Sequence, residues 1–87
     1  MIVVRGLIWD DWNREHLSKH QISTNDVEEV CRGDYKVVKS YRKRILLKCK
    51  IRAGRLLALV LSPEDREGRL YGDGIYYVIT TFEEVLI

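Results

Sequence analysis

Alternation of hydrophobic and polar residues is clearest from Arg44 to Arg52, where apolar side chains occupy almost every second position. A period of two places successive side chains on opposite faces of a β-strand, so one face of this strand should pack on a core and the other should be cationic. Similar runs predict strands over residues 2–8, 35–41 and 75–81. The nearly continuous apolar run after Arg55, LLALVLS, suits a central strand buried on both faces.

A helical period replaces the alternation between the first two of these strands. Trp9, Trp12, His16 and His20 follow one another at helical spacings and should share one face. That face suits either the floor of a cleft or the edge of a core, with the tryptophans expected in the core. Asp10 or Asp11 is expected to cap the first helix, which should stop near Gln21. The capping residues at 23–26 then predict the start of a second helix, which should end at Gly33.

These elements predict an α+β fold in one domain spanning residues 1–87. The order is an N-terminal strand, a two-helix hairpin and a four-stranded antiparallel meander, followed by a short helical tail over 82–87. The helices are expected to pack on one face of the sheet. Between the last two strands, residues 63–74 form a long loop, which is either a mobile flap or a tip with no role.

The cysteines and the N-terminal segment of the sequence favour a cytoplasmic protein. Cys31 and Cys49 sit at apolar positions without metal-finger spacing, so free buried thiols are expected rather than a disulfide. The N-terminal apolar run is interrupted by Arg5 and followed by acids, unlike a signal peptide. No run reaches the roughly 18 apolar residues that a membrane span needs. We therefore expect a soluble, intracellular protein without a membrane partner.

Charge is strongly segregated along the chain. Ten of the 15 lysine and arginine residues lie between Arg32 and Arg55, with a single acid among them. Cations on alternate positions of a strand could follow successive phosphates of RNA, with Tyr35 and Tyr41 available for stacking. A solvated sheet face or a site for an acidic protein would use the same surface. The candidate RNA-binding residues are Arg44, Lys48, Lys50 and Arg52.

The two histidines are candidates for proton transfer. A histidine near its ordinary pKa of about 6.5 can move protons at neutral pH, although packing histidines bonded to backbone or carboxylates are more common. His16 and His20 lack the further ligands that a metal site needs. Nucleophile motifs, phosphate-binding glycine loops and dinucleotide fingerprints are absent as well. We expect neither a metal nor a cofactor.

Several short motifs, in this order and separation, resemble the BrnT-like toxins of bacterial type II toxin–antitoxin systems, which have a RelE-like ribonuclease fold. The matching segments are IWDD at 8–11, KHQIS at 19–23, VEEV at 27–30, AGRLL at 53–57 and YVIT at 77–80. The resemblance covers most of the chain. It implies metal-independent cleavage of RNA and an antitoxin that covers the toxin, with toxin–antitoxin hetero-oligomers or homo-oligomers as the assemblies.

The resemblance also implies a set of catalytic residues. Lys19 and His20 match the family's Lys-His pair, and Arg55 matches its Gly-Arg turn. We assign proton transfer to His20 and phosphate binding to Lys19 and Arg55. The family's C-terminal arginines are missing, since Thr80 is followed by TFEE. An alternative is therefore a non-catalytic RNA- or protein-binding module of the same fold, a decayed toxin.

Overall fold

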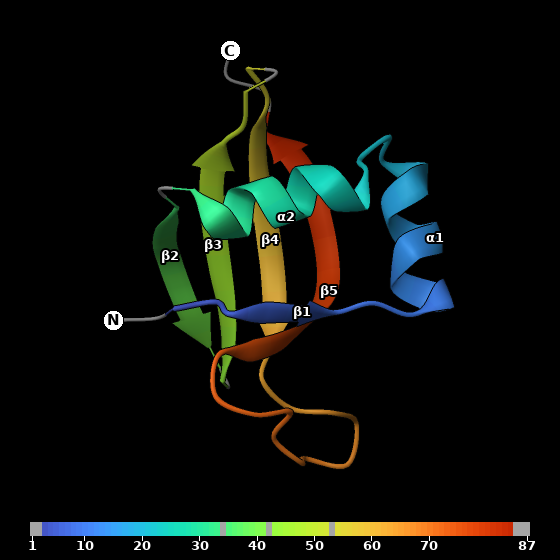
Figure 1. Ribbon diagram of the computed structural model, residues 1–87, viewed down its shortest axis with the longest axis vertical. Helices are drawn as coiled ribbons and strands as arrows, with labels where there is room; N and C mark the ends of the chain where they lie inside the picture. Colours follow the sequence, from blue (N-terminus) through green and yellow to red (C-terminus); the bar gives the residue numbers. More distant parts are fainter. Residues whose placement is uncertain (1–2, 34, 42, 53, 85–87) are drawn as a thin grey trace.

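The computed structural model describes residues 3–33, 35–41, 43–52 and 54–84. Its elements are β1 (Gly6–Ile8), α1 (Asp11–Lys19), α2 (Thr24–Arg32), β2 (Lys36–Tyr41), β3 (Arg44–Lys50), β4 (Leu56–Ser62) and β5 (Ile75–Glu84). The strands form one sheet in the order β1-β5-β4-β3-β2 (Figure 1). Strands β2 to β5 are an antiparallel meander, and β1 runs parallel to β5. The predicted α+β class and the meander are confirmed.

Strand β4 lies in the middle of the sheet and is buried on both faces, as predicted. Leu57, Leu59 and Leu61 are fully buried on the face toward α2, and Ala58 is fully buried on the opposite face. The core cluster also contains Leu47 of β3, Val78 of β5 and the apolar stripe of α2. Each buried leucine contributes about 2 kcal/mol of transfer free energy, so this cluster is the main source of stability.

The last strand is longer and the first strand shorter than the sequence pattern predicts. The helical tail is wrong over residues 82–84, because Phe82, Glu83 and Glu84 pair with Ala58, Leu57 and Leu56 of β4. Pairing along the whole of β4 satisfies the backbone groups of β5, which outweighs the helix propensity of the glutamates. The rest of the predicted tail, 85–87, lies outside the described residues, as do residues 1–2 of the predicted first strand.

Asp10 begins α1 through a capping box, as predicted. Its Oδ1 accepts the N–H of Asn13 at 2.9 Å, and Oδ1 of Asn13 accepts the N–H of Asp10 at 2.8 Å. The Asn13 side chain is buried, and its Nδ2 donates to the carbonyls of Ile8 at 2.9 Å and Val78 at 3.2 Å. One amide therefore fastens the start of α1 to β1 and to β5.

The two helices take different places on the sheet. Helix α2 crosses one face, whereas α1 stands beside the edge of β5 (Figure 1). Gln21 between them has a φ of 56°, in the left-handed region, and this residue lets the chain turn. Ser23 then caps α2 in a second capping box, with Asp26, and Gly33 ends the helix, as predicted. Neither helix is long and apolar enough to cross a membrane, within the residues described.

Cys31 and Cys49 are thiols and not a disulfide, as expected from their spacing, but they are half-buried rather than fully buried. Burial, with the nearby charge of Glu28, raises the pKa of the Cys31 thiol to about 12. A thiol with such a pKa stays protonated at neutral pH and is a poor nucleophile. Cys31 therefore has the character of a packing residue.

Candidate functional site

Three of the four aromatic residues assigned to one face of the first helix form a column along α1. The rings of Trp12 and His16 are stacked, with centroids 5.1 Å apart and planes at 5°. His16 and His20 meet edge to face at 5.3 Å and 67°. Nε2 of His16 also lies 3.0 Å from the Thr80 hydroxyl oxygen of β5. A continuous row of rings thus leads from the start of α1 to its end.

The expectation that both tryptophans belong to the core is wrong for Trp12, which is 52% exposed. Helix α1 lies at the sheet edge and turns Asn13 and Leu17 inward, which leaves the neighbouring position of Trp12 outside. Trp9 precedes the helix, packs against the core and donates its indole N–H to Glu28 at 3.0 Å. The two tryptophans therefore have separate roles.

Lys19 and His20, the predicted catalytic pair, are exposed at the C-terminal end of α1. His20 caps the helix, and its backbone N–H donates to the carbonyl of Leu17 at 2.9 Å. The side chains of both residues therefore extend from an ordered helix end and remain accessible to a ligand.

Arg55 lies next to this helix end, at the start of β4. Its Nη1 donates to the carbonyl of Gln21 at 3.1 Å, directly after His20 in the chain. Its Nε and Nη2 meet Oε1 of Glu83 at 3.0 Å and 2.9 Å, and Asp26 lies 3.8 Å from Nη1. The structure therefore brings all three predicted catalytic residues to one end of the sheet, with Arg55 holding the turn that carries His20.

We expect Arg55→Ala to lower the free energy of unfolding by about 1 kcal/mol, because the ion pairs of Arg55 are partly exposed and screened by water. Urea denaturation of Arg55→Ala, Glu83→Gln and the double variant would measure a coupling of about 0.5–1 kcal/mol between the two residues. Arg69→Ala is the matched control, since the Arg69 side chain is 80% exposed and 3.9 Å from its partner. Additive effects of the two single changes would contradict the network.

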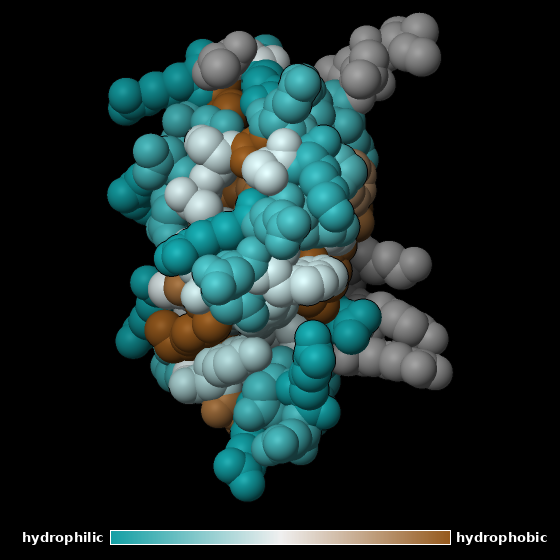
Figure 2. All heavy atoms as spheres, turned by 90° about the vertical axis from the view of Figure 1, so that its right-hand side faces the viewer, coloured by the Kyte–Doolittle hydropathy of each residue, from teal (hydrophilic) through white to brown (hydrophobic). Residues whose placement is uncertain are grey.

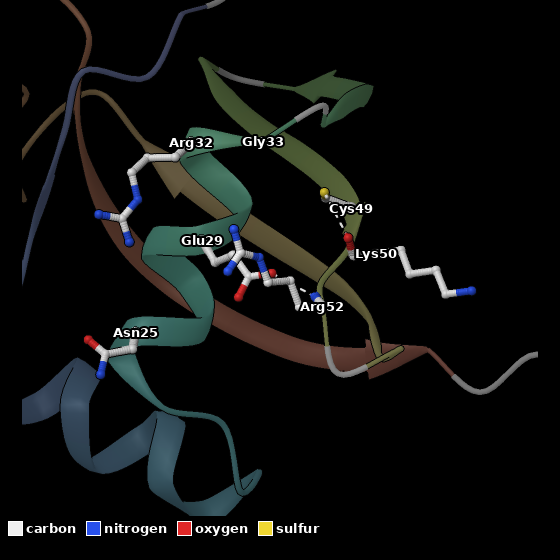
Figure 3. A pocket seen from close by; sticks show the side chains of 7 residues that line it. All are labelled: Asn25, Glu29, Arg32, Gly33, Cys49, Lys50 and Arg52. Carbon is white, nitrogen blue, oxygen red and sulfur yellow. Dashed lines mark hydrogen bonds between the residues drawn. The ribbon is translucent and has the colours of Figure 1, made fainter.

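The predicted basic row is divided between the two sides of the sheet. Lys48 and Lys50 share the face opposite α2, and Lys48 forms an ion pair with Glu84 at 2.5 Å. Arg52 follows the end of β3, and its backbone N–H donates to Oε2 of Glu29 at 2.6 Å. In Figure 3 the Arg52 side chain lies beside Glu29 of α2, while that of Lys50 points away. Both residues line the hollow drawn there, about 750 Å³ in volume, but the Arg52 side chain lies on the α2 side of it and leaves the row.

The fourth predicted cation, Arg44, lies at the other end of β3 and lines a second hollow. This hollow has a volume of about 500 Å³ and lies between the start of α1, the strands and the loop over 63–74. We call it the aromatic hollow. Its lining includes Trp12, Tyr71, Tyr77, Ile79, Arg44 and Arg66.

Tyr77 fastens the wall of the aromatic hollow. Its hydroxyl lies 3.0 Å and 2.9 Å from the two carboxylate oxygens of Asp10, and its ring stacks on that of Tyr71 with centroids 6.4 Å apart. The backbone N–H of Asn13 has the largest effect on Asp10 and lowers its pKa, whereas burial raises it; the Tyr77 hydroxyl and then Arg66 lower it further, so that the pKa lies below its ordinary value. Burial, followed by the bond to Asp10, raises the pKa of Tyr77 to about 12. Tyr77 is therefore a neutral donor at physiological pH.

Sequence reasoning missed the tyrosines of the aromatic hollow and assigned others instead. Tyr35 packs against the core, and its hydroxyl accepts the N–H of Val4 at 3.2 Å. The side chain of Tyr41 lies outside the described residues. Tyr71 precedes and Tyr77 follows the last turn of the loop over 63–74. This position next to a long loop was the signal in the sequence that could have indicated the two tyrosines. Among the described residues, no three His, Cys, Asp or Glu side chains are grouped as a metal site requires.

A four-stranded antiparallel meander, a parallel first strand and a helix at the sheet edge make this chain an α+β domain with the BrnT-like fold. Among solved structures it is similar to the ribonuclease toxin BrnT of Brucella abortus, with a TM-score of 0.68 over 93% of this chain and 97% of that one. The two sequences are 19% identical, so what they share is the fold. No family model and no curated protein matches the sequence.

Proposed function

We propose that this protein is the toxin of a bacterial type II toxin–antitoxin system, and that it cleaves RNA without a metal and is neutralised by an antitoxin. The observation that carries the proposal is an exposed Lys19–His20 pair beside Arg55, in a chain with the fold of a ribonuclease toxin. Cleavage of RNA through its own 2′-hydroxyl needs a proton acceptor and a cation for the developing phosphorane charge. These three side chains supply both.

In this mechanism His20 takes the proton of the ribose 2′-hydroxyl as the oxygen attacks the neighbouring phosphorus. The bond from phosphorus to the leaving 5′-oxygen then breaks as this oxygen takes a proton from water, and His20 returns its proton to the solvent. The products are a 2′,3′-cyclic phosphate and a 5′-hydroxyl. Lys19 stabilises the negative charge on the phosphoryl oxygens. Arg55 uses one N–H on each nitrogen for Glu83 and Gln21 and keeps one N–H on each Nη for a phosphate.

The basic face of β3 is proposed to extend the RNA site. Lys48 and Lys50 lie one strand repeat apart, roughly 7 Å, at the same end of the sheet as Arg55. Lys50 is exposed and has no ion pair among the described residues. Arg52 stands apart from these two and is the weakest of the candidate RNA contacts.

One observation favours a non-catalytic binding module as the second candidate. Glu83 and Glu84, which lie in the C-terminal segment that lacks the arginines of the resembled family, form ion pairs with Arg55 and Lys48. Two of the cations proposed for RNA are therefore partly neutralised by the end of β5. Such a protein would bind RNA or an antitoxin but would not cleave RNA.

Incubating the purified protein with total RNA in the presence of EDTA tests the proposal. We expect RNA fragments with 5′-hydroxyl and cyclic-phosphate ends, together with growth arrest when the protein is induced in bacteria. Co-expression of a neighbouring antitoxin reading frame should restore growth. Intact RNA and normal growth would refute the proposed toxin function and would favour the non-catalytic binding module.

A further inference from the structure

The aromatic hollow lies outside the proposed catalytic end of α1 and has chemistry of its own. Trp12 offers a half-exposed indole whose ring is already held parallel to His16, so stacking a ligand on Trp12 costs little ordering entropy. Tyr71 and Tyr77 supply a stacked pair in the same lining. Flat aromatic walls around an open hollow fit a planar ring.

Four acids and two bases line the aromatic hollow, so an anionic ligand is favoured by the hydrogen-bond donors that remain available and not by the net charge. Each of three carboxylates has donors from the protein itself. Asp10 accepts the backbone N–H of Asn13 and the hydroxyl of Tyr77. Glu64 accepts a hydrogen bond from Nζ of Lys43 at 2.6 Å. Asp65 accepts two backbone N–H groups of its loop, each at 2.9 Å. The fourth acid, Glu67, lies 3.9 Å from Arg69 at the exposed loop tip.

The two guanidiniums of the aromatic hollow keep their hydrogen-bond donors available, although the charge of Arg66 acts on Asp10. Arg44 and Arg66 both line it, and within the described part of the chain neither forms an ion pair or a side-chain hydrogen bond. A planar ring carrying a phosphate would stack on the aromatic side chains and bring an acceptor to these donors.

The surrounding surface agrees with a polar ligand. Figure 2 looks onto the side of the molecule that carries α1, and the atoms coloured there are mostly hydrophilic, with small separate hydrophobic areas. A broad apolar patch, such as a hydrophobic protein partner would need, is missing from this coloured surface.

We infer that the aromatic hollow is a nucleotide-binding subsite for single-stranded RNA, in which a base stacks on Trp12 and its phosphate meets Arg44 and Arg66. The inference rests on the proposed function for the nature of the polymer. The column of rings from Trp12 to His20 spans two helical turns, roughly 12 Å, so this base lies beside the cleaved bond rather than at it. Trp12 therefore sets where RNA sits relative to His20.

Binding of a fluorescent oligouridine with 2′-O-methyl riboses tests the subsite without cleavage, because this RNA lacks the attacking hydroxyl. We expect Trp12→Ala to weaken binding roughly 10-fold, and Trp12→Phe to retain most of the affinity. Arg44→Ala and Arg66→Ala should each reduce the slope of log affinity against log salt by about 0.7. Val38→Ala is the matched control, since Val38 is 51% exposed on β2 at the opposite edge of the sheet.

The outcomes separate this subsite from the catalytic proposal. Equal affinity of wild type and Trp12→Ala, both folded by circular dichroism, would overturn the subsite even if the wild type cleaves RNA. If the oligouridine binds in a Trp12-dependent way but the wild type does not cleave RNA, the inferred subsite stands and the proposed toxin function is refuted. Trp12-dependent binding of an oligoarginine peptide without binding of the RNA would overturn the inference in favour of a basic protein partner.

Discussion

Replacing His20 with alanine is expected to lower the rate of RNA cleavage by about 100-fold or more, because general acid–base catalysis by one side chain typically contributes that much. The side chain is exposed at the end of α1, so the free energy of unfolding should stay within about 0.5 kcal/mol of wild type. Single-turnover cleavage of a labelled RNA, beside urea denaturation of the same samples, measures both quantities.

Glu15→Gln provides the control for this prediction, since Glu15 is exposed on the same helix and belongs to neither proposed site. It should cleave at the wild-type rate. Full activity of His20→Ala, combined with loss of activity in Lys19→Ala, would assign proton transfer to another group. Affinity for the 2′-O-methyl RNA should change little in His20→Ala, which would locate the defect in the chemical step.

The second large effect is expected from Asn13→Ala, which should lower the free energy of unfolding by about 3 kcal/mol. The change removes the acceptor of the Asp10 N–H and both donors to the carbonyls of Ile8 and Val78. Leaving buried polar groups without partners costs about 1–3 kcal/mol each, and water can satisfy part of that loss at the helix start. The midpoint of thermal unfolding should fall by roughly 15 °C for a domain of this size.

Asn13→Asp distinguishes hydrogen bonding from side-chain size, since aspartate keeps the acceptor but loses both donors. We expect it to be at least as destabilising as alanine, because a carboxylate would face two carbonyl oxygens. Arg14→Ala, at the exposed neighbouring position, should change stability by less than about 0.5 kcal/mol. A small effect of Asn13→Ala would show that the start of the helix is held by Leu17 and the Asp10 side-chain cap alone.

Local chemistry made much of the fold predictable. The period of two predicts β3, and the continuous apolar run after Arg55 predicts β4. The capping residues place the starts of both helices, because all of these signals depend on neighbours in sequence. The end of β5 depends instead on how much of β4 remains to be paired, a long-range property. Arg52 leaves its predicted face because the N–H of Ile51 donates to the carbonyl of Arg55, closing the hairpin before Arg52 can continue the strand.

The candidate site was predictable only in part for a similar reason. The Lys19–His20 pair and Arg55 are matched by short motifs, and the fold brings them to one end of the sheet. The aromatic hollow combines Trp12 with residues more than 50 positions away, so no local pattern indicates it. The role of Asn13 likewise requires Val78 as a partner, and a buried amide looks like any helix residue in the sequence.

The pairing of β1 with β5 determines how late the fold of this protein can close. The first strand and the first helix both find their partners in the last strand, at Ile75–Tyr77 and at Val78 and Thr80. Contacts that span the whole chain form late, and a ribosome must release nearly all of the chain before they can close. Until then Asn13 and His16 lack their partners on β5, and α1 is not held at the edge of the sheet. Under the proposed toxin function, nascent chains would therefore be inactive, and the released, folded chain would be the first form that the proposed antitoxin needs to meet.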